Sequence, residues 1–317
     1  MNDTLAQEYL RELHVVRQVS KNTLDAYQRD LRILLTKLEE AGIAVADLST
    51  DQVRVWAARL HAQGGSPRSI ARVLSAWRGF YIWLANHKNL LQSNPLDDVR
   101  PPKRSKPLPK ALSVEHAINL VEQSSQENIQ ADKFLRARDR AVVELLYSSG
   151  LRLSELLGID VYPLENKDYQ SAGWIDFDML EVMVLGKGNK RRTVPVGSAA
   201  ITAIREWLVV RELYAKDVNV IGQPLFINKQ GRRVSARTIQ KHLASLALKA
   251  GLPTHVHPHM LRHTFASHVL QSSGDLRAVQ EMLGHASISS TQIYTALDFQ
   301  HLAQAYDQAH PRAKGKK

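Results

Sequence analysis

The stretch His257-Pro-His-Met-Leu-Arg-His263 places three histidines and one arginine within seven residues of this 317-residue chain. Proline is favoured at the first position of a helix, because the N–H that it lacks would have no partner there. A helix that starts near Pro258 sets His259 and Arg262, three residues apart, on one face. Both side chains can then reach the same oxygen of an anionic ligand, so the stretch predicts a helix with a functional face.

A second arginine and a tyrosine suggest which chemistry this face performs. Arg152 lies in Gly150-Leu-Arg-Leu-Ser-Glu-Leu156, and together with Arg262 it supplies two guanidinium groups. Guanidinium groups keep their charge and match phosphate oxygens in a bidentate manner. A phenol, with an ordinary pKa of roughly 10, can attack phosphorus and later depart from it, and Tyr294 supplies one. The combination predicts a site that cleaves a phosphodiester, with Tyr294 as the nucleophile.

Two further residues complete the candidate catalytic set. Lys187 lies between two glycines in Leu185-Gly-Lys-Gly-Asn189, a sequence that favours a hairpin tip. An ammonium group there can protonate the departing 5′ oxygen as a general acid. His285, in Leu283-Gly-His285, lies nine residues before Tyr294 and can bind the phosphate or orient the nucleophile.

Each of these elements has a simpler explanation when it is taken alone. A single tyrosine usually packs or lies at the surface, and Arg152 with Glu155 makes an ordinary exposed ion pair on a helix. The basic run at residues 190–192, with Lys187, reads equally well as a solvated hairpin end that attracts DNA. Their combination in one chain favours catalysis.

Five histidines between His255 and His268 raise the question of a metal site. The chain has no cysteine and no His-Glu-x-x-His motif, and a cation would be repelled by Arg262. We therefore expect no metal, and we interpret His263 and His268 as structural groups.

The composition favours a nucleic-acid partner. Lysine and arginine number 42 against 31 acidic residues, a net charge of +11 with a pI near 9.8. Such an excess is typical of phosphate-binding proteins, whose affinity falls steeply with salt. No phosphate-binding glycine loop is present, so no nucleotide and no cofactor are expected. The candidate DNA-binding residues are Arg68, Arg72, Lys103, Arg104, Lys106, Lys190 and Arg191.

The length of the chain and one proline-rich stretch predict two domains. A single core rarely serves more than about 250–300 residues. Residues 94–110 concentrate prolines and basic side chains, which favour an extended connector. We therefore expect an N-terminal DNA-binding domain over residues 1–93, a linker over 94–110 and a catalytic domain over 111–317. No apolar run is long enough to span a membrane or to act as a signal, so a cytosolic protein is expected.

Periodicity predicts a mainly α-helical fold. Four helices are expected before the linker, three of them with visible apolar stripes at residues 20–42, 49–64 and 66–84. Most of the second domain is again helical. Residues 174–177, 181–185 and 192–196 combine β-forming residues with turns and predict a small three-stranded antiparallel sheet whose second hairpin presents Lys187.

Taken together, these motifs resemble the tyrosine recombinase (phage integrase) family, over nearly the whole chain. The Arg152 segment, the Gly-Lys-Gly hairpin, the His-Pro-His stretch, Leu-Gly-His and Thr291-Gln-Ile-Tyr294 carry the resemblance. The sequence after Thr291 is similar to the XerC-type members of the Xer subgroup. The resemblance implies that Arg152, Lys187, His259, Arg262 and His285 activate Tyr294, and that Glu155 supports Arg152. It also implies a two-domain C-shaped clamp, in which a SAM-like core-binding domain closes over DNA opposite the catalytic domain.

The resemblance further implies a function. Such an enzyme exchanges DNA strands through a 3′-phosphotyrosyl intermediate and a Holliday junction, without metal or ATP. It would act in a heterotetramer with a XerD-like recombinase, under a septal DNA translocase, to resolve chromosome dimers at cell division. A phage-type integrase, a type IB topoisomerase-like enzyme and a non-catalytic DNA-binding regulator are the alternatives. Residues 161–173 form a longer segment than the Xer pattern leads us to expect, and we interpret them as a surface loop.

Overall fold

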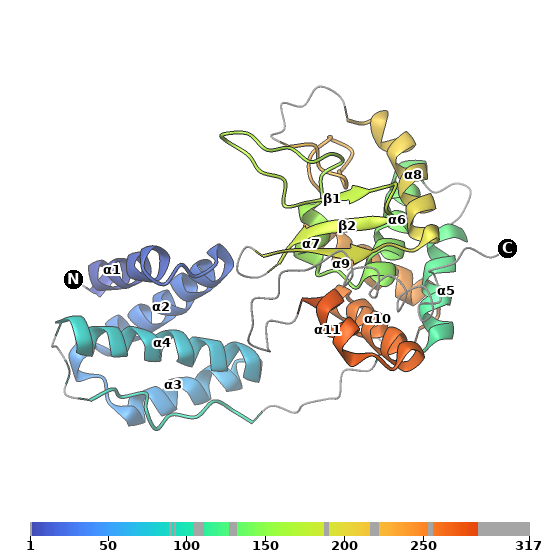
Figure 1. Ribbon diagram of the computed structural model, residues 1–317. Coiled ribbons are helices and arrows are strands. Elements are labelled where there is room, and N and C mark those ends of the chain that lie inside the picture. Colours follow the sequence, from blue (N-terminus) through green and yellow to red (C-terminus); the bar gives the residue numbers. More distant parts are fainter. Residues whose placement is uncertain are drawn as a thin grey trace. The chain divides into compact units, whose positions relative to one another are not determined.

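The computed structural model describes residues 2–88, 91, 93–103, 111–126, 132–186, 190–215, 222–252 and 256–284 (Figure 1). The chain divides into two compact units, Met1–Pro107 and Leu108–Lys317. The described residues form eleven α-helices and one three-stranded sheet, which confirms the mainly helical fold. Among them, no helix combines the length and the apolar character needed to cross a membrane.

The N-terminal unit contains the four predicted helices. They are α1 (Asn2–Val15), α2 (Lys21–Ala41), α3 (Thr50–Ala62) and α4 (Pro67–Lys88). Serine residues cap two of them: Ser20 and Ser49 each accept a backbone N–H three residues on, at 3.3 and 3.2 Å. Gly42 ends α2 in the left-handed conformation, with φ of 64°.

The core of this unit is built on α4. Its apolar stripe is buried as predicted and comprises Ile70, Val73, Leu74, Trp77, Tyr81 and Leu84. The polar atoms of two of these rings are satisfied, because Trp77 donates to the carbonyl of Asp30 and Tyr81 to that of Val45, both at 2.8 Å. These bonds fasten α4 to α2 and to the short turn after it.

The first residues of the proline-rich stretch pack onto the same unit. Leu96 and Val99 are buried in its core. Arg78 of α4 donates to both of their carbonyl groups, at 2.9 and 2.8 Å. Residues 94–99, which the proline pattern assigns to the linker, therefore belong to the folded N-terminal unit.

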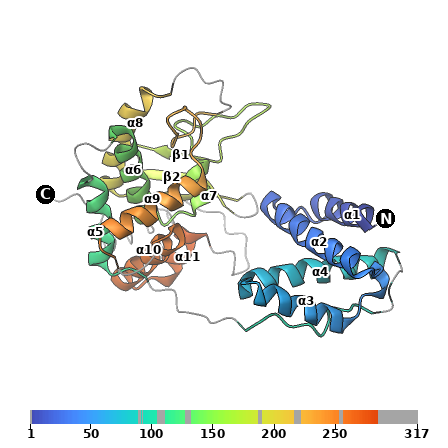
Figure 2. The same cartoon turned by 180° about the vertical axis from the view of Figure 1, so that it is seen from behind.

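The C-terminal unit, which corresponds to the predicted catalytic domain and is called the catalytic unit below, consists of seven helices around a small sheet within the described residues. The helices are α5 (Val114–Gln126), α6 (Lys133–Ser149), α7 (Leu153–Gly158), α8 (Ser198–Glu212), α9 (Ala236–Lys249), α10 (Pro258–Ser273) and α11 (Leu276–Leu283). Helix α6 lies in the middle of this unit, in contact with α5, α8 and α10 (Figures 1 and 2). The second half of α6 is almost completely buried.

The sheet confirms the predicted strands to within one residue. Its strands are β1 (Gly173–Asp176), β2 (Glu181–Leu185) and β3 (Arg191–Pro195), paired antiparallel in that order. Side chains alternate between the two faces, as strand geometry requires. Val182, Val184 and Val194 face the core, and the alternation in β3 places Arg192 on the same inner face as Val194.

The segment between α7 and β1 is a surface loop tied at its base to one buried carboxylate. Asp160 accepts hydrogen bonds from the hydroxyl groups of Tyr169 and Ser171, at 2.6 and 2.7 Å, and from the guanidinium of Arg233 at 2.6 Å. Residues farther out are exposed, including Tyr162 at 67%. The unexpectedly long segment is therefore anchored, although its outer part is open to solvent.

Candidate active site

Half of the predicted catalytic residues fall within the described structure. Arg152, His259 and Arg262 are described, with the supporting Glu155. Lys187, His285 and Tyr294 lie outside the described residues, as do the predicted DNA-binding residues Arg104 and Lys106.

A tight turn positions Arg152. Helix α6 ends at Gly150, which adopts the left-handed conformation with φ of 57°. A Cβ atom at this position would lie 2.3 Å from the ring of Phe265 on α10, so only glycine allows the approach. Helix α7 begins directly after this turn, and Arg152 is its N-cap residue. The turn thereby brings Arg152 to the side of α10 that carries Arg262.

Glu155 binds both the backbone N–H and the guanidinium group of Arg152. Its Oε2 atom accepts the backbone N–H of Arg152 at 2.8 Å, which satisfies a free donor at the start of α7. Its Oε1 atom accepts the guanidinium Nη1 of Arg152 at 2.7 Å. The carboxylate side chain is only 4% exposed, whereas that of Arg152 is 30% exposed. Arg152 therefore has a fixed base and a partly open guanidinium group.

Arg192 is a third arginine at this site, and its placement corrects the interpretation of residues 190–192 as an exposed basic run. Its Nη1 and Nη2 atoms donate to the two oxygens of Glu155, each at 2.8 Å, and its Nε–H donates to the carbonyl of Met282 at 3.0 Å. The side chain is 7% exposed. The signal that could have revealed it is the alternation of β3, which puts Arg192 on the face of Val194.

Arg262 connects α10 to the turn between α6 and α7 and to the end of α11. The helix begins at Pro258 as predicted, and His257 caps it by accepting the N–H of Met260 at 3.2 Å. Arg262 donates to the carbonyl of Gly150 at 2.7 Å and to that of Leu283, the last residue of α11. Its Nη1 atom also lies 4.0 Å from Glu155.

These side chains form the arginine cluster, defined here as Arg152, Arg192 and Arg262 around Glu155. Burial alone would raise the pKa of Glu155, but the hydrogen bonds and charges of Arg192 and Arg152 outweigh it and hold that pKa below its ordinary value. Burial and the neighbouring Arg152 lower the pKa of Arg262 to about 10, which still leaves it protonated near neutral pH. The three positive charges and one negative charge of the cluster sum to +2. This net positive charge favours the binding of an anionic phosphate.

His259 lies on the exposed side of α10, beside the cluster. Partial burial, together with the charges of His257 and Arg262, lowers the pKa of His259 below its ordinary value. The imidazole is therefore neutral near pH 7, and it can donate one N–H and accept one proton. His263 is exposed, so it does not have the role of a buried core group. His268 does have that role: it is buried between the Tyr147 hydroxyl and the Leu112 carbonyl, both at 3.0 Å.

Comparison with known proteins identifies the family of this chain. The phage integrase family pattern matches residues 118–301, and the "Phage integrase, N-terminal SAM-like domain" pattern matches residues 6–88. The chain is 53% identical to tyrosine recombinase XerC 1 of Ralstonia nicotianae, over 97% of this chain and 93% of that protein. It is 46% identical to tyrosine recombinase XerC of Pseudomonas aeruginosa, over 97% of this chain and 95% of that protein.

This chain belongs to the phage integrase family of tyrosine recombinases. It is a site-specific recombinase, a DNA strand-exchange enzyme that uses a tyrosine nucleophile. Among solved structures, it resembles the XerH site-specific recombinase bound to palindromic difH substrate in a post-cleavage complex. That match has a TM-score of 0.67 at 24% identity, and it covers 95% of this chain and 84% of the XerH chain. The likeness shows that the two proteins share a fold.

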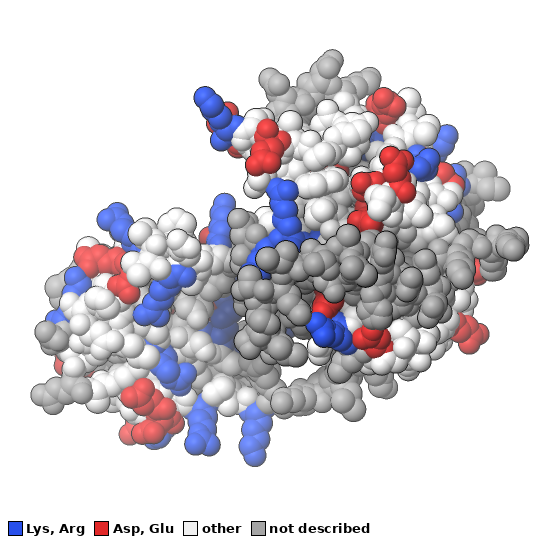
Figure 3. Space-filling view, in the orientation of Figure 1, with Lys and Arg blue, Asp and Glu red and all other residues white. Residues whose placement is uncertain are grey.

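The predicted DNA-binding residues of the recombinase that are described are all exposed, namely Arg68, Arg72, Lys103, Lys190 and Arg191. Arg68 and Arg72 line one shallow surface pocket, and Arg72 also pairs with the buried Asp30 at 2.9 Å. Lysine and arginine side chains project from the N-terminal unit at several separate points, with acidic groups between them (Figure 3). Their contact with DNA stays a prediction.

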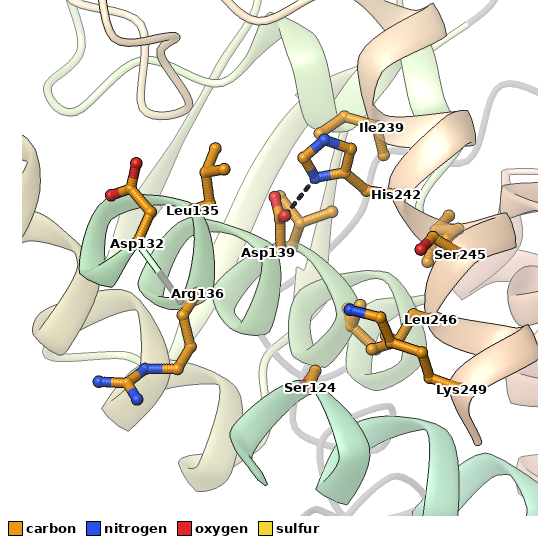
Figure 4. A pocket seen from close by; sticks show the side chains of 13 residues that line it. Ser124, Asp132, Leu135, Arg136, Asp139, Ile239, His242, Ser245, Leu246 and Lys249 are labelled. Carbon is orange, nitrogen blue, oxygen red and sulfur yellow. Dashed lines mark hydrogen bonds and ion pairs between the residues drawn. The ribbon is translucent and has the colours of Figure 1, made fainter. Parts of the chain in front are cut away.

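A separate cavity of the recombinase lies between α5, α6 and α9, with a volume of about 360 Å³ (Figure 4). Asp139 and His242, which line it, form a hydrogen bond with each other, and Leu135 and Ile239 contribute apolar side chains to the lining. None of the predicted site residues lines it. Within the described part of the chain, no group of three or more histidine or acidic side chains is placed to hold a metal ion.

Proposed function

We propose that this recombinase cleaves DNA with Tyr294 at the arginine cluster and acts together with a XerD-like recombinase. The observation that carries the proposal is the net positive charge of that cluster, in which Arg152 and Arg262 converge on one carboxylate. A pentacovalent phosphate carries additional negative charge on its non-bridging oxygens, and preorganised guanidinium donors stabilise it most effectively.

In the proposed reaction, the phenolic oxygen of Tyr294 forms a bond to the scissile phosphorus. The bond from phosphorus to the deoxyribose 5′ oxygen breaks, and Lys187 gives that oxygen a proton. Neutral His259 donates to the phosphate or receives the phenolic proton, and His285 binds the phosphate. The products are a 3′-phosphotyrosyl enzyme and a free 5′ hydroxyl. Because the ester keeps the bond energy, the hydroxyl of a partner duplex can reverse the reaction without ATP or metal.

The biological role is proposed from the relatives, which are XerC recombinases at 46–53% identity. We infer that the protein acts in the cytoplasm in a heterotetramer with a XerD-like recombinase, on a short DNA recombination site. Exchange of strands there would convert chromosome dimers to monomers at cell division, under control of a septal DNA translocase. The resemblance alone supports a clamp in which both units grip DNA, with contacts from Arg68, Arg72, Lys103, Arg104, Lys106, Lys190 and Arg191.

The test is the formation of a covalent adduct. Purified protein is mixed with a nicked, end-labelled duplex that carries a Xer recombination site, with and without a XerD-like partner, and is resolved on a denaturing gel. The wild type should form an adduct, and Tyr294→Phe should form none while it still binds DNA. Tyr162→Phe changes an exposed loop tyrosine and should retain the adduct.

Other results would favour the alternatives. Equal adduct on unrelated DNA would indicate a type IB topoisomerase-like enzyme. Complete recombination of a phage-type site by this chain alone would indicate an integrase. Tight, specific binding with no adduct under any condition would indicate a non-catalytic regulator.

A further inference from the structure

Arg192 joins three parts of the catalytic unit that lie far apart in the sequence. It belongs to β3, it binds both carboxylate oxygens of Glu155 on α7, and it donates to the carbonyl of Met282 in the last turn of α11. A carbonyl at a helix C-terminus lacks a partner within the helix, and a cation there also interacts favourably with the helix dipole. One side chain therefore fixes the strand, the Arg152 helix and the end of α11 against one another.

The surroundings of Arg192 leave it little freedom to move. A Cβ atom at Gly284, which has a φ of 62°, would lie 3.0 Å from the Cδ atom of Arg192. A Cβ atom at Gly186, at the end of β2, would lie 3.3 Å from its Nη1 atom. Two glycines thus border the guanidinium, and any larger residue would press on it. Arg192 is enclosed, in contrast to the more open Arg152.

Arg192 and Arg152 bind Glu155 with different numbers of guanidinium donors. A desolvated carboxylate needs compensation, and Arg192 supplies it with a bidentate pair. Arg152 donates to Glu155 through Nη1 alone, and its Nη2 and Nε atoms make no hydrogen bond to a described residue. Arg192 therefore satisfies most of the carboxylate and leaves Arg152 with donors that a phosphate can take.

The three anchored segments are those that lead to the proposed catalytic groups. β3 begins four residues after Lys187 in the sequence, and Met282 precedes His285 by three residues. Arg152 shares Glu155 with Arg192. Catalysis depends on such groups being held within a fraction of an ångström.

We propose that Arg192 is a positioning residue of the recombinase: through Glu155 and the Met282 carbonyl it sets the placement of Arg152 and of the segments that carry Lys187 and His285. It does so without touching DNA. This inference rests on the proposed roles of those three residues, and it predicts that loss of Arg192 slows DNA cleavage without weakening DNA binding.

The test compares Arg192→Lys and Arg192→Met with Arg138→Lys. Arg138 is a matched control because it is also a buried arginine of the same unit, pairs with Asp139 at 2.8 Å and donates to the carbonyl of Ile227, and none of these contacts involves Glu155. The initial rate of adduct formation is measured on saturating nicked duplex, and DNA affinity is measured separately by fluorescence anisotropy. Circular dichroism at the assay temperature ensures that only folded protein is compared.

We expect Arg192→Met to slow adduct formation by about 100-fold, the penalty for a misplaced catalytic group, and Arg192→Lys to slow it less. DNA affinity of both variants and the cleavage rate of Arg138→Lys should stay within about twofold of wild type. Combining Arg192→Met with Glu155→Gln should cost little more than the slower single change, because both act through one pair.

Three results would overturn the inference. Wild-type cleavage by Arg192→Lys and Arg192→Met would show that the contact is not needed. Loss of DNA affinity in proportion to the rate would show a direct phosphate contact. An equal loss of rate in Arg138→Lys would show a general effect of destabilisation. If the wild type itself forms no Tyr294-dependent adduct, the proposed function fails and the inference fails with it.

Discussion

Glu155 and Asp160 are two buried carboxylates, five residues apart, with different surroundings. Asp160 accepts from the hydroxyl groups of Tyr169 and Ser171 and from one guanidinium, that of Arg233. One negative charge there meets one positive charge. Glu155 lies among three guanidinium groups, two bound to it and one 4.0 Å away. The first network is balanced, whereas the second has an excess of positive charge that an incoming anion can neutralise.

The difference indicates how a structural network can be distinguished from a functional one. Guanidinium groups crowded in a partly desolvated site repel one another, which costs folding stability. A protein gains from such a site when a charged ligand completes it, and perturbed titration is therefore enriched at functional sites. The balanced network around Asp160 ties down a surface loop and requires no ligand. Changes in the two networks should therefore have different consequences.

The largest expected difference is in catalysis. Arg152→Met removes a phosphate donor from the arginine cluster and should slow adduct formation by a factor of about 100 to 1,000, as loss of one preorganised donor does. Arg233→Met removes the arginine of the balanced network. It should lower the melting temperature but leave the cleavage rate of the folded protein within about twofold of wild type. Adduct formation and thermal unfolding are measured on both variants. If only Arg233→Met slowed cleavage, the network around Asp160 and not the arginine cluster would support catalysis.

The second difference is in the response to anions. Asp160→Asn and Glu155→Gln each remove a buried negative charge from its partners and should each lower the free energy of unfolding by about 3 kcal/mol. Glu155→Gln leaves three positive charges together, whereas Asp160→Asn leaves one. Sodium sulfate, compared with sodium chloride at equal ionic strength, should therefore restore more stability to Glu155→Gln, because bound anion stabilises the folded state. Denaturant unfolding in both salts measures this, and equal recovery would show that the charge excess is unimportant.

Local sequence signals were sufficient for most of the fold. Serine and glycine caps mark helix ends, and the apolar stripe of α4 is read directly from its period. These signals work because they depend on residues only three or four apart. The proline-rich pattern of residues 94–110 misplaced the domain boundary, since Arg78 binds the carbonyl groups of Leu96 and Val99 by contacts that no local pattern contains.

The arginine cluster shows a different limit. Arg152, Glu155 and Arg262 were identified from motif spacing and family resemblance, and the structure brings these side chains together. From the sequence, Arg192 belongs to a basic run with Lys190 and Arg191, and one interpretation of that run is a solvated hairpin end. Its partners lie 37 and 90 positions away, so composition could not reveal them. Strand alternation was the available signal, but an inward-facing arginine conflicts with the usual rule that arginine stays exposed.

A smaller effect is expected at two glycines that end helices. Gly274 and Gly284 both have left-handed backbones, with φ of 69° and 62°. Nothing lies within 4 Å of a Cβ atom at Gly274, so Gly274→Ala should cost only the backbone strain of about 1 kcal/mol and should leave cleavage unchanged. Gly284→Ala adds a collision with Arg192 and should also slow adduct formation by about tenfold. Equal cleavage rates would show that Arg192 adapts freely.

The smallest expected effect is on the pH dependence of folding stability, in which the buried carboxylate of Glu155 and the buried imidazole of His268 should differ. Burial lowers the pKa of His268 below its ordinary 6.5, so the unfolded chain takes up a proton more readily. Its stabilising contribution is therefore complete above about pH 6.5 and is lost as pH falls through the folded value. The pKa of Glu155 is lowered from 4.5, so its contribution is lost only in more acidic solution.

Denaturant unfolding between about pH 7.5 and 2.5 should therefore show two separate losses of stability. Substitution His268→Gln should weaken the dependence that begins near pH 6.5, and Glu155→Gln should weaken only the dependence below about pH 4.5. His263→Gln removes an exposed imidazole from the same helix and is the control. If His268→Gln retained the full wild-type dependence near pH 6, then the buried imidazole would not need to be neutral, and the hydrogen bonds with Tyr147 and Leu112 would not limit its protonation.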